Sequence, residues 1–482
     1  MGVLSNYEPV NVFQYFEKIC SIPHGSTNVG QISNYLVEFA KERGLKYRQD
    51  EKKNVIIWKD GSEGYEQSEP VILQGHMDMV AVKVDGCDKN METDGLDLEV
   101  LDGDLISAKG TSLGGDNGIA VAIMLAVLDD DSIAHPPLEA VFTVDEEIGM
   151  LGADYIDVSD LKGRLFMNMD SEDEGVFTVS CAGGATATCI LPYDTETMTA
   201  DVLKVRLDGF IGGHSGVEIN KGRLNANVTL GRILYGAEYE DFRLISVNGG
   251  EKDNAIATYS EAVIAVPKDQ IDQTKETMQA VMAEVQAEYS AVDPDIKISF
   301  EEQGEQEVTC MTALATASVI TCLVNLPNGI QRMNPEMEGM VQTSLNLGIL
   351  STSDADVRFS YAVRSSSETE KEFLIDKLHC LTEFLGGSVE ISGAYPGWEY
   401  KSDSRLRDVM VETYKSLYGK EPVVEGIHAG LECGMFSAKM EGLDAVSFGP
   451  QMANVHTTNE VLSISSTKRT WDLVLKVFEK LK

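Results

Sequence analysis

The sequence predicts an α/β protein with a mixed-sheet main domain that is discontinuous in the chain and carries an inserted α+β lid. Three observations lead to this prediction. The chain has 482 residues, which is too long for one ordinary hydrophobic core. Helical and strand patterns alternate first, a strand-rich region follows, and the last part returns to the first pattern. We therefore expect a main domain of residues 1–185 and 398–482, with a lid of residues 186–397.

The first part predicts two amphipathic helices, followed by strands and one further helix. Apolar residues recur at helical spacing over residues 10–20 and 32–39, and Gly44 is a suitable helix stop. Strands are expected over residues 54–58, 71–74, 138–144 and 164–169, and a helix over residues 117–128. Such an alternation favours a mostly parallel or mixed sheet with both faces covered, whose ligands gather at the loops beyond the strand ends.

The lid region predicts a βαββαβ order and then a second, less complete version of it. The first version consists of a strand at 203–210, a helix at 224–237, strands at 243–247 and 261–266, a helix at 273–289 and a strand at 295–300. The second consists of a helix at 312–325, two strands within 342–364, a helix at 370–385 and a strand at 388–392. This order predicts a lid of doubled ferredoxin-like type.

After the lid, the chain returns to the style of the main domain. We expect a helix at 404–418, strands at 423–427 and 445–448, and a terminal helix at 466–481. A chain that leaves one domain and re-enters it implies a discontinuous domain with an insertion.

Composition excludes several classes of partner. The formal net charge is −39, and because nucleic acids and anionic membranes bind positive surfaces, we expect neither as a partner. No apolar run reaches the length of a membrane span, and the N-terminus lacks the features of a signal peptide, so a cytoplasmic protein is expected. No CxxC pair occurs, and Cys189, Cys322 and Cys380 lie in apolar settings, which predicts reduced core thiols.

Two polar residues follow the buried-type strand that begins at Val71. His76 and Asp78 are two positions apart, so both side chains can project from the same face at the end of the sheet. The alternative is a single histidine whose hydrogen bonds are satisfied near a turn.

A glycine-rich loop precedes the expected helix at 117–128 and contains Asp116. The glycines around it are Gly110, Gly114, Gly115 and Gly118. No Lys-Ser/Thr pair follows them, so the loop is not a phosphate loop. Asp116 could cap the helix, but its two oxygens could also bridge two cations.

Three consecutive carboxylates, Asp145, Glu146 and Glu147, follow the strand at 138–144. They repel one another unless a cation or solvent neutralises them. Neighbouring side chains diverge, so one Glu can bind a metal while the other reaches its water. A solvated acidic turn is the competing interpretation.

Two more segments complete the set of candidate ligands. Asp170 follows the strand at 164–169, and His456 lies in the segment 454–460. The imidazole and carboxylate groups together suit zinc, manganese or cobalt better than a soft metal.

At this point the sequence resembles the aminoacylase and carboxypeptidase-like metallopeptidases with co-catalytic zinc, and it is most similar to their aminoacyl-histidine dipeptidase branch. The resemblance covers nearly the whole chain. The motifs that carry it are GHMDMV, SLGGDNGIA, DEEIGMLGA, NMDSEDEG, GGHSGVEI, DNAI, HAGLECGMF and HTTNE. No metal position departs from the family pattern.

The resemblance implies hydrolysis of dipeptides, Xaa-His and broader, by a water that bridges two divalent metals. It places His76 and Asp170 on one metal, Glu147 and His456 on the other, and Asp116 between them. It also implies Glu146 as the general base, Asp78 as the carboxylate that orients the site through His76, and a cis peptide bond between Asp116 and Asn117. Zinc is the expected metal, with manganese or cobalt possible.

The resemblance further implies substrate-binding residues in the lid. His214 would stabilise the oxyanion, and Asn254 and Arg364 would bind the substrate, with Arg364 holding a peptide carboxylate. Gly430 and Glu432 are expected to line the same pocket. An exposed loop histidine and a surface ion pair are the simpler interpretations of His214 and Arg364. The doubled lid is compatible with either a monomer or a homodimer.

Three alternatives remain to be separated from a dipeptidase. The nearest is another hydrolase on this scaffold, either an N-acyl amino acid deacylase or a tripeptide aminopeptidase. A catalytically inactive metal-binding homologue belongs to a different class, but it should have lost the base or a ligand, and here all these positions are filled. A nucleotide-binding enzyme is excluded because the chain has neither a phosphate-loop lysine nor a GxGxxG fingerprint.

Overall fold

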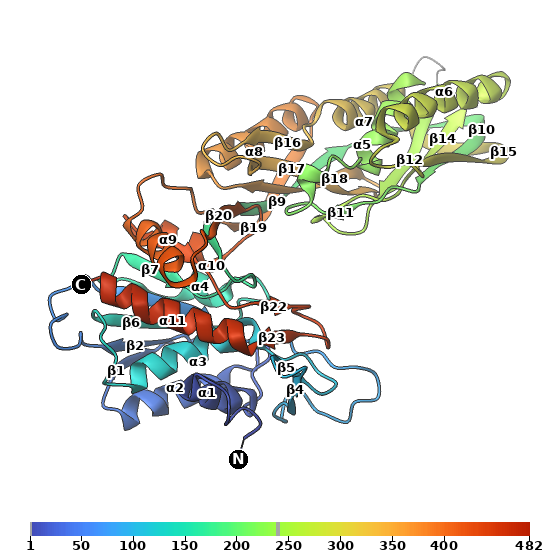
Figure 1. Ribbon diagram of the computed structural model, residues 1–482. Coiled ribbons are helices and arrows are strands. Elements are labelled where there is room, and N and C mark those ends of the chain that lie inside the picture. Colours follow the sequence, from blue (N-terminus) through green and yellow to red (C-terminus); the bar gives the residue numbers. More distant parts are fainter. Residues whose placement is uncertain (1, 238–241) are drawn as a thin grey trace. The chain divides into compact units, whose positions relative to one another are not determined.

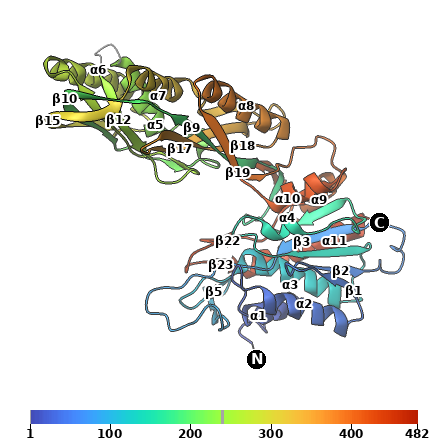
Figure 2. The ribbon, with the colours of Figure 1, turned by 180° about the vertical axis from the view of Figure 1, so that it is seen from behind.

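The computed structural model describes residues 2–237 and 242–482, which form two compact units. Unit 1 comprises the chain up to Ser180, Tyr400–Gly426 and Leu431–Lys482, and unit 2 comprises Cys181–Glu399 and Ile427–Gly430. Figures 1 and 2 show the chain from opposite sides. In the described ranges, no helix is both long enough and apolar enough to cross a membrane.

Unit 2 differs from the predicted lid, residues 186–397, at its ends and by one added segment. It extends from Cys181 to Glu399 and also includes Ile427–Gly430, which the prediction had assigned to the main domain. The added segment belongs to unit 2 because the backbone N–H of Ala182 donates to two of its carbonyl oxygens, at 3.0 and 3.1 Å.

Unit 1 is built on an eight-stranded mixed sheet with the order β1-β2-β6-β3-β7-β21-β8-β20. Its strands are β1 (Lys46–Gln49), β2 (Val55–Lys59), β3 (Val71–His76), β6 (Leu138–Thr143), β7 (Leu165–Asn168), β8 (Val176–Cys181), β20 (Val423–Ile427) and β21 (Asp444–Ser447). β3 runs parallel to β6 and β7, and β21 runs parallel to β7, whereas β2 is antiparallel to β1 and β6. The sequence predicted six of these strands and missed β1 and β8.

The central strands of this sheet are buried on both faces. Every residue of β3, β6 and β7 is buried, as is typical of strands covered by helices on both sides. Figures 1 and 2 show α1 (Val10–Cys20), α2 (Gly30–Glu42) and α3 (Gly115–Asp129) on one side, with α4 (Leu151–Tyr155) and α10 (Glu432–Lys439) on the other. Because β3, β6 and β7 are parallel, the residues that follow them lie at the same edge of the sheet.

Two more helices and a small sheet complete unit 1. α9 (Arg405–Tyr418) and α11 (Ile464–Lys480) correspond to the helices predicted at the C-terminus and pack against each other. A four-stranded sheet has the order β22-β23-β5-β4. Its strands are β22 (Met452–Ala453), β23 (Val461–Ser463), β5 (Leu105–Ala108) and β4 (Leu98–Leu101). The loop between β22 and β23 carries the predicted ligand His456.

Unit 2 is built on a nine-stranded sheet with the order β15-β10-β14-β12-β17-β18-β9-β19, and β16 pairs with β17. Its strands are β9 (Gly183–Pro192), β10 (Thr195–Asp208), β12 (Arg243–Gly249), β14 (Ser260–Val266), β15 (Lys297–Met311), β16 (Gly329–Met333), β17 (Val341–Thr352), β18 (Asp356–Ser365) and β19 (Ser388–Tyr395). Its helices are α5 (Ala226–Gly236), α6 (Ile271–Tyr289), α7 (Ala313–Asn325) and α8 (Glu368–Phe384). The doubled ferredoxin-like arrangement stays an interpretation of this strand order.

The strand missing from the predicted second repeat is β9, which precedes the first repeat in the chain. β9 pairs antiparallel with both β18 and β19. The prediction omitted it because its Gly-Gly-Ala-Thr-Ala-Thr sequence carries few of the large β-branched or aromatic residues that indicate a strand.

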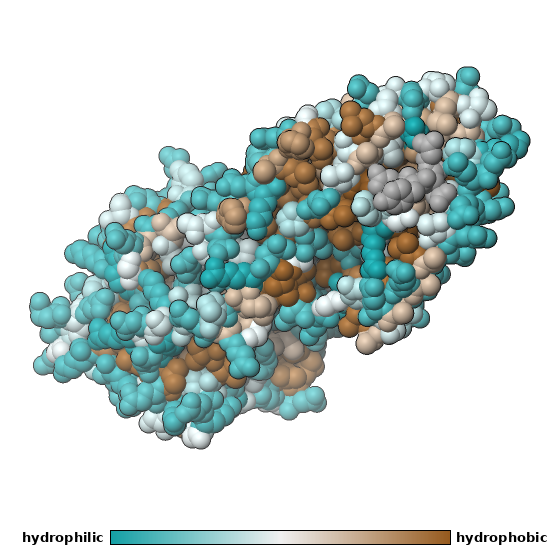
Figure 3. Space-filling model, turned by 90° about the horizontal axis from the view of Figure 1, so that it is seen from above, coloured by the Kyte–Doolittle hydropathy of each residue, from teal (hydrophilic) through white to brown (hydrophobic). Residues whose placement is uncertain are grey.

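The core of unit 2 forms from helix residues and one face of its sheet. Leu230 and Ile233 of α5 and Leu374 and Leu378 of α8 are fully or almost fully buried in it. Cys189 and Cys322 belong to this core, as predicted, but the prediction for Cys380 was wrong because its side chain is exposed on the outer face of α8. Hydrophilic side chains cover much of the face in Figure 3, in keeping with the acidic composition.

Candidate active site

His76 is the last residue of β3, and its two ring nitrogens have separate partners. Nδ1 lies 3.0 Å from the backbone oxygen of Asp78, while Nε2 lies 3.1 Å from Asp116 Oδ1 and 3.5 Å from Asp170 Oδ1. Donation from Nδ1–H to the carbonyl oxygen leaves the lone pair of Nε2 directed at the two carboxylates, as a metal ligand requires.

Asp116 lies between the two histidines. Its Oδ1 faces His76, and its Oδ2 lies 3.2 Å from Nε2 of His456. The peptide bond between Asp116 and Asn117 is cis, as expected. The Asn117 side chain donates to Asp170 Oδ1 at 2.9 Å, which fixes that carboxylate relative to the same loop.

Glu147 and His456 form the second pair of groups. Glu147 Oε2 lies 3.0 Å from Nε2 of His456. The other oxygen of Glu147 is buried and has no hydrogen-bond partner among the described residues. An unpartnered buried carboxylate oxygen is costly, and a cation at this position would satisfy it.

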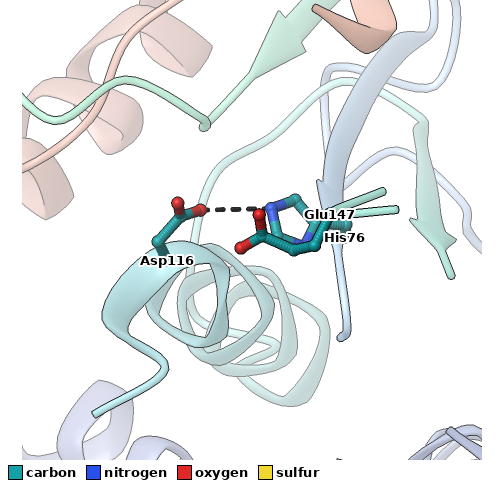
Figure 4. A group of neighbouring side chains, drawn as sticks. All are labelled: His76, Asp116 and Glu147. Carbon is teal, nitrogen blue, oxygen red and sulfur yellow. Dashed lines mark hydrogen bonds and ion pairs between the residues drawn. The ribbon is translucent and has the colours of Figure 1, made fainter. Parts of the chain in front are cut away.

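The structure therefore brings all five predicted metal ligands together: His76, Glu147 and Asp170 at or after the ends of parallel strands, Asp116 in the first turn of α3, and His456 in the loop between β22 and β23. His76, Asp116 and Glu147 each offer a ligand atom, and these atoms lie within 4.8 Å of one another. Figure 4 shows the three side chains turned toward one another, with His76 at the end of β3 and Asp116 in the first turn of α3. The oxygen and imidazole donor set fits a pair of divalent cations.

The pKa values of the cluster indicate which of its groups would hold protons in the absence of a cation. Burial raises the pKa of Glu146 to about 9 and that of Asp170 to about 6. Hydrogen bonds with Asp116 and Glu147 raise the pKa of His456 to about 10. For His76, burial acts to lower the pKa, but Asp170 and Asp116 raise it well above its ordinary value. Protons would thus occupy this cluster wherever divalent cations did not.

We predict that metal binding weakens as the pH is lowered. The raised pKa values mean that His76 and His456 carry protons in the metal-free protein at neutral pH, and a metal ion must displace them. The apparent affinity should fall about tenfold per pH unit for each proton displaced. Equilibrium dialysis of the metal-free protein with Zn²⁺ at several pH values measures this slope. An affinity that is independent of pH across the neutral range contradicts the ligand set.

Asp78 lies beneath the cluster and is fully buried. Its Oδ1 accepts the backbone N–H of Glu146 at 3.1 Å, and its Oδ2 accepts the hydroxyl of Ser26 at 2.8 Å. Its Oδ1 also lies 3.5 Å from His76 Nδ1. Asp78 thus connects the histidine to the loop that carries Glu146. Ser26 leaves no signal in the sequence, since it lies far from Asp78 in the chain and in no motif.

Glu432, which is predicted to line the substrate pocket, is completely buried in unit 1. Its Oε2 accepts hydrogen bonds from Gln74 Nε2 at 2.5 Å and from Thr143 Oγ1 at 2.7 Å. Burial raises its pKa to about 7. Gln74 and His76 are on the same face of β3, so Glu432 contacts the strand that ends at His76, and its part in the substrate pocket stays a prediction.

His214 ends the short strand β11 (Gly213–His214) of unit 2, and Asn254 directly precedes the neighbouring strand β13 (Ala255–Ile256). The two strands pair, and the backbone N–H of Ser215 donates to the carbonyl oxygen of Asn254 at 2.9 Å. The Nδ1 atom of His214 accepts two backbone N–H groups at 3.2 Å, so its proton resides on Nε2. Burial and the nearby Arg364 lower the pKa of His214, so the neutral ring can donate from Nε2.

Arg364 lies near the end of β18, an interior strand of the unit 2 sheet that pairs with β17 and β9. It is 8 % exposed, and its Nη1 donates to the Tyr395 hydroxyl at 3.2 Å, while its buried Nε has no hydrogen-bond partner among the described residues. His428 is also buried in unit 2, and its Nε2 lies 2.7 Å from Ser344 Oγ. Burial and Arg364 lower the pKa of His428 to about 3. His428 was quoted in a motif but received no role.

The fold and this cluster define a class of protein. The family model described as peptidase family M20/M25/M40 matches residues 72–480. The chain therefore belongs to this peptidase family, and the resemblance identified in the sequence is confirmed.

Similar proteins span the full length of the chain. It is 36% identical over 484 residues to the cytosol non-specific dipeptidase of Escherichia coli (strain K12), covering 100% of this chain and 99% of that protein. The crystal structure of aminoacylhistidine dipeptidase from Vibrio alginolyticus matches with a TM-score of 0.95 and 35% identity, covering 100% of this chain and 98% of that chain. Aminopeptidase PepT from Bacillus cereus ATCC 10987 matches with a TM-score of 0.57 and 15% identity, covering 98% of this chain and 99% of that chain. At that identity it shows the shared fold alone.

Proposed function

We propose that this chain is a dipeptidase that hydrolyses its substrate at a pair of divalent metal ions. One observation carries the proposal: the two oxygens of Asp116 face His76 and His456 separately, and each histidine has its own acidic partner. The full-length similarity to two dipeptidases supports the choice of dipeptides as substrates.

We assign the described side chains to two metal ions. His76 and Asp170 would hold one, Glu147 and His456 the other, and Asp116 would bridge them. Bound ions would supply positive charge that lowers the pKa of a water and polarises the scissile carbonyl. Zinc is the metal that we propose first, because this donor set suits it, and manganese or cobalt would occupy the same ligands.

Glu146 is the group we assign to proton transfer. Its backbone is held by Asp78, and its side chain is next to the ligand Glu147 without being assigned to a metal. The raised pKa of Glu146 belongs to the cation-free cluster, and two nearby positive charges would lower it. As a carboxylate, Glu146 would take the proton of the attacking water and deliver it to the leaving amine.

Residues of unit 2 would bind two groups of the substrate, the carbonyl oxygen of the scissile bond and the carboxylate of the dipeptide. His214 carries its proton on Nε2 and is suited to donate a hydrogen bond to the developing oxyanion. The Nε–H group of Arg364, which has no hydrogen-bond partner among the described residues, suits the carboxylate of a dipeptide. We keep Asn254, Gly430 and Glu432 as substrate-binding residues on the strength of the family resemblance. We also propose that the protein is cytoplasmic and that it acts as a monomer or a homodimer.

A substrate panel tests the function. The protein should be loaded with Zn²⁺ and assayed on β-Ala-His, Ala-Ala, Ala-Ala-Ala and N-acetyl-alanine, with and without a chelator. We expect both dipeptides to be hydrolysed, the tripeptide and the N-acetyl compound to be poor substrates, and the chelator to abolish activity. Preferential cleavage of the tripeptide or of N-acetyl-alanine would overturn the dipeptidase assignment in favour of the related hydrolases. Failure to cleave any of them with two metals bound would favour an inactive homologue.

A further inference from the structure

Glu460 places its carboxylate against the loop that carries Asp116. Its Oε2 accepts the backbone N–H groups of Leu113 at 2.7 Å and Gly114 at 3.0 Å. Its Oε1 accepts those of Gly115 at 2.8 Å and Asp116 at 3.3 Å. Four consecutive backbone donors thus point at one side chain that is 3 % exposed.

The same residue belongs to the segment that carries His456. Glu460 directly precedes β23, and its backbone oxygen accepts the hydroxyl of Ser107 on β5 at 3.0 Å. Its backbone is therefore tied to the small sheet, while its side chain reaches the start of α3. Glu460 connects the loop of Asp116 to the loop of His456, although the two are far apart in the chain.

The hydrogen bonds also account for the composition of the Asp116 loop. The backbone N–H groups at the start of a helix have no intrahelical partner, and a buried carboxylate satisfies them strongly. A Cβ atom at Gly115 would come within 3.2 Å of Glu460 Oε1, closer than most such contacts. Gly114 adopts a positive φ of 65°, which glycine accommodates without strain. The glycines let the backbone approach the carboxylate.

We propose that Glu460 is a positioning residue of the metal centre, which sets the spacing between the Asp116 carboxylate and the His456 imidazole. The inference rests on the proposed metal pair, because it gives a function to the 3.2 Å approach of Asp116 Oδ2 to His456 Nε2. Glu460 itself contacts neither that nitrogen nor a substrate. Its effect is exerted through the four backbone N–H groups.

Substitution of Glu460 by Gln tests the inference. The amide keeps the size of the side chain but replaces one acceptor oxygen with an NH₂ group, which would face two of the four backbone donors. We expect the affinity for the second of two Co²⁺ ions to fall about 10- to 100-fold, as for losses of partners that orient metal ligands. The visible absorption of the Co²⁺-loaded protein should also change, because the ligand geometry is altered. Titration of the metal-free protein with Co²⁺ measures both without any substrate.

A matched control separates positioning from general stability. Glu174 also uses both carboxylate oxygens in unit 1, accepting two hydrogen bonds of 2.6 Å from Arg469, but it contacts no residue of the metal cluster. E174Q should lower the melting temperature and leave Co²⁺ affinity and absorption as in the wild type. Equal loss of Co²⁺ affinity in E174Q and E460Q would overturn the positioning role, and so would wild-type affinity in E460Q.

If E460Q does not fold, E460D provides the second test. Aspartate keeps the charge but has a shorter reach, so we expect it to fold and to show a smaller loss of affinity for the second Co²⁺ ion. Wild-type affinity in E460D together with an unfolded E460Q would overturn the inference. Failure of the proposed function would give a different result. The wild-type protein itself would then not bind two ions or would not cleave dipeptides.

Discussion

E146Q should reduce kcat for dipeptide hydrolysis by about 10³- to 10⁴-fold while the protein keeps both metal ions. The glutamine has nearly the same shape as Glu146, but its amide cannot take the proton from the attacking water. The backbone of residue 146 stays bound to Asp78 through its N–H group, so the neighbouring ligand Glu147 should keep its position. Steady-state kinetics and metal analysis of the purified variant measure the two quantities independently.

The control for this prediction is a carboxylate near the cluster that has no assigned role. Although much of the Glu172 side chain is exposed, partial desolvation of its carboxyl group and the charge of Asp116 raise its pKa to about 6, which places it close to the site. E172Q should change kcat by no more than a few-fold. If E146Q loses metal, its role as a base is wrong and Glu146 is a ligand. If E146Q retains wild-type turnover, another group transfers the proton.

H214A should lower kcat by about 10²- to 10³-fold, the range found when one oxyanion donor is removed. The Nε2–H group of His214 is the only donor of this side chain, since its Nδ1 accepts two backbone N–H groups. Substitution removes a hydrogen bond that should strengthen only as the carbonyl oxygen becomes negative, so KM should change much less than kcat. Kinetics on a single dipeptide at saturating metal measure both parameters.

His379 provides the matched control for His214. It lies on α8 of the same unit and is 35 % exposed, and Glu383 is the only hydrogen-bond or ion-pair partner of its ring among the described residues. H379A should leave kcat and KM unchanged. An increase in KM with an unchanged kcat in H214A would mean that His214 binds the substrate in its ground state and does not stabilise the oxyanion.

Much of the metal cluster could be predicted from the sequence because of where its members lie. His76 ends a buried apolar strand, and Glu147 and Asp170 closely follow two more. The apolar run that predicts each strand also shows where that strand ends, and the polar residue lies at or just after that end. Asp116 and His456 follow no such strand, and their assignment came from the family resemblance.

Other parts of the structure leave no local pattern in the sequence. The carboxylate of Glu460 and the backbone groups it binds are separated by more than 340 residues. His428 lies near Arg364 only because residues 427–430 join unit 2 through Ala182. In each case the interaction is set by the tertiary structure. The sequence did not predict the burial of Glu432 for the same reason, since its partners Gln74 and Thr143 lie on strands that are far from it in the chain.

The order of the strands in unit 1 has a consequence for the synthesis of this peptidase. β21 joins the sheet beside β7, although all of unit 2 except Ile427–Gly430 lies between β7 and residue 400 in the chain. His456 and Glu460 emerge from the ribosome later still. A nascent or truncated chain therefore has β7 as an open sheet edge and lacks part of the metal cluster. With the proposed ligands, hydrolytic activity would begin only after nearly the whole chain has been made, so incomplete copies would cleave no peptides.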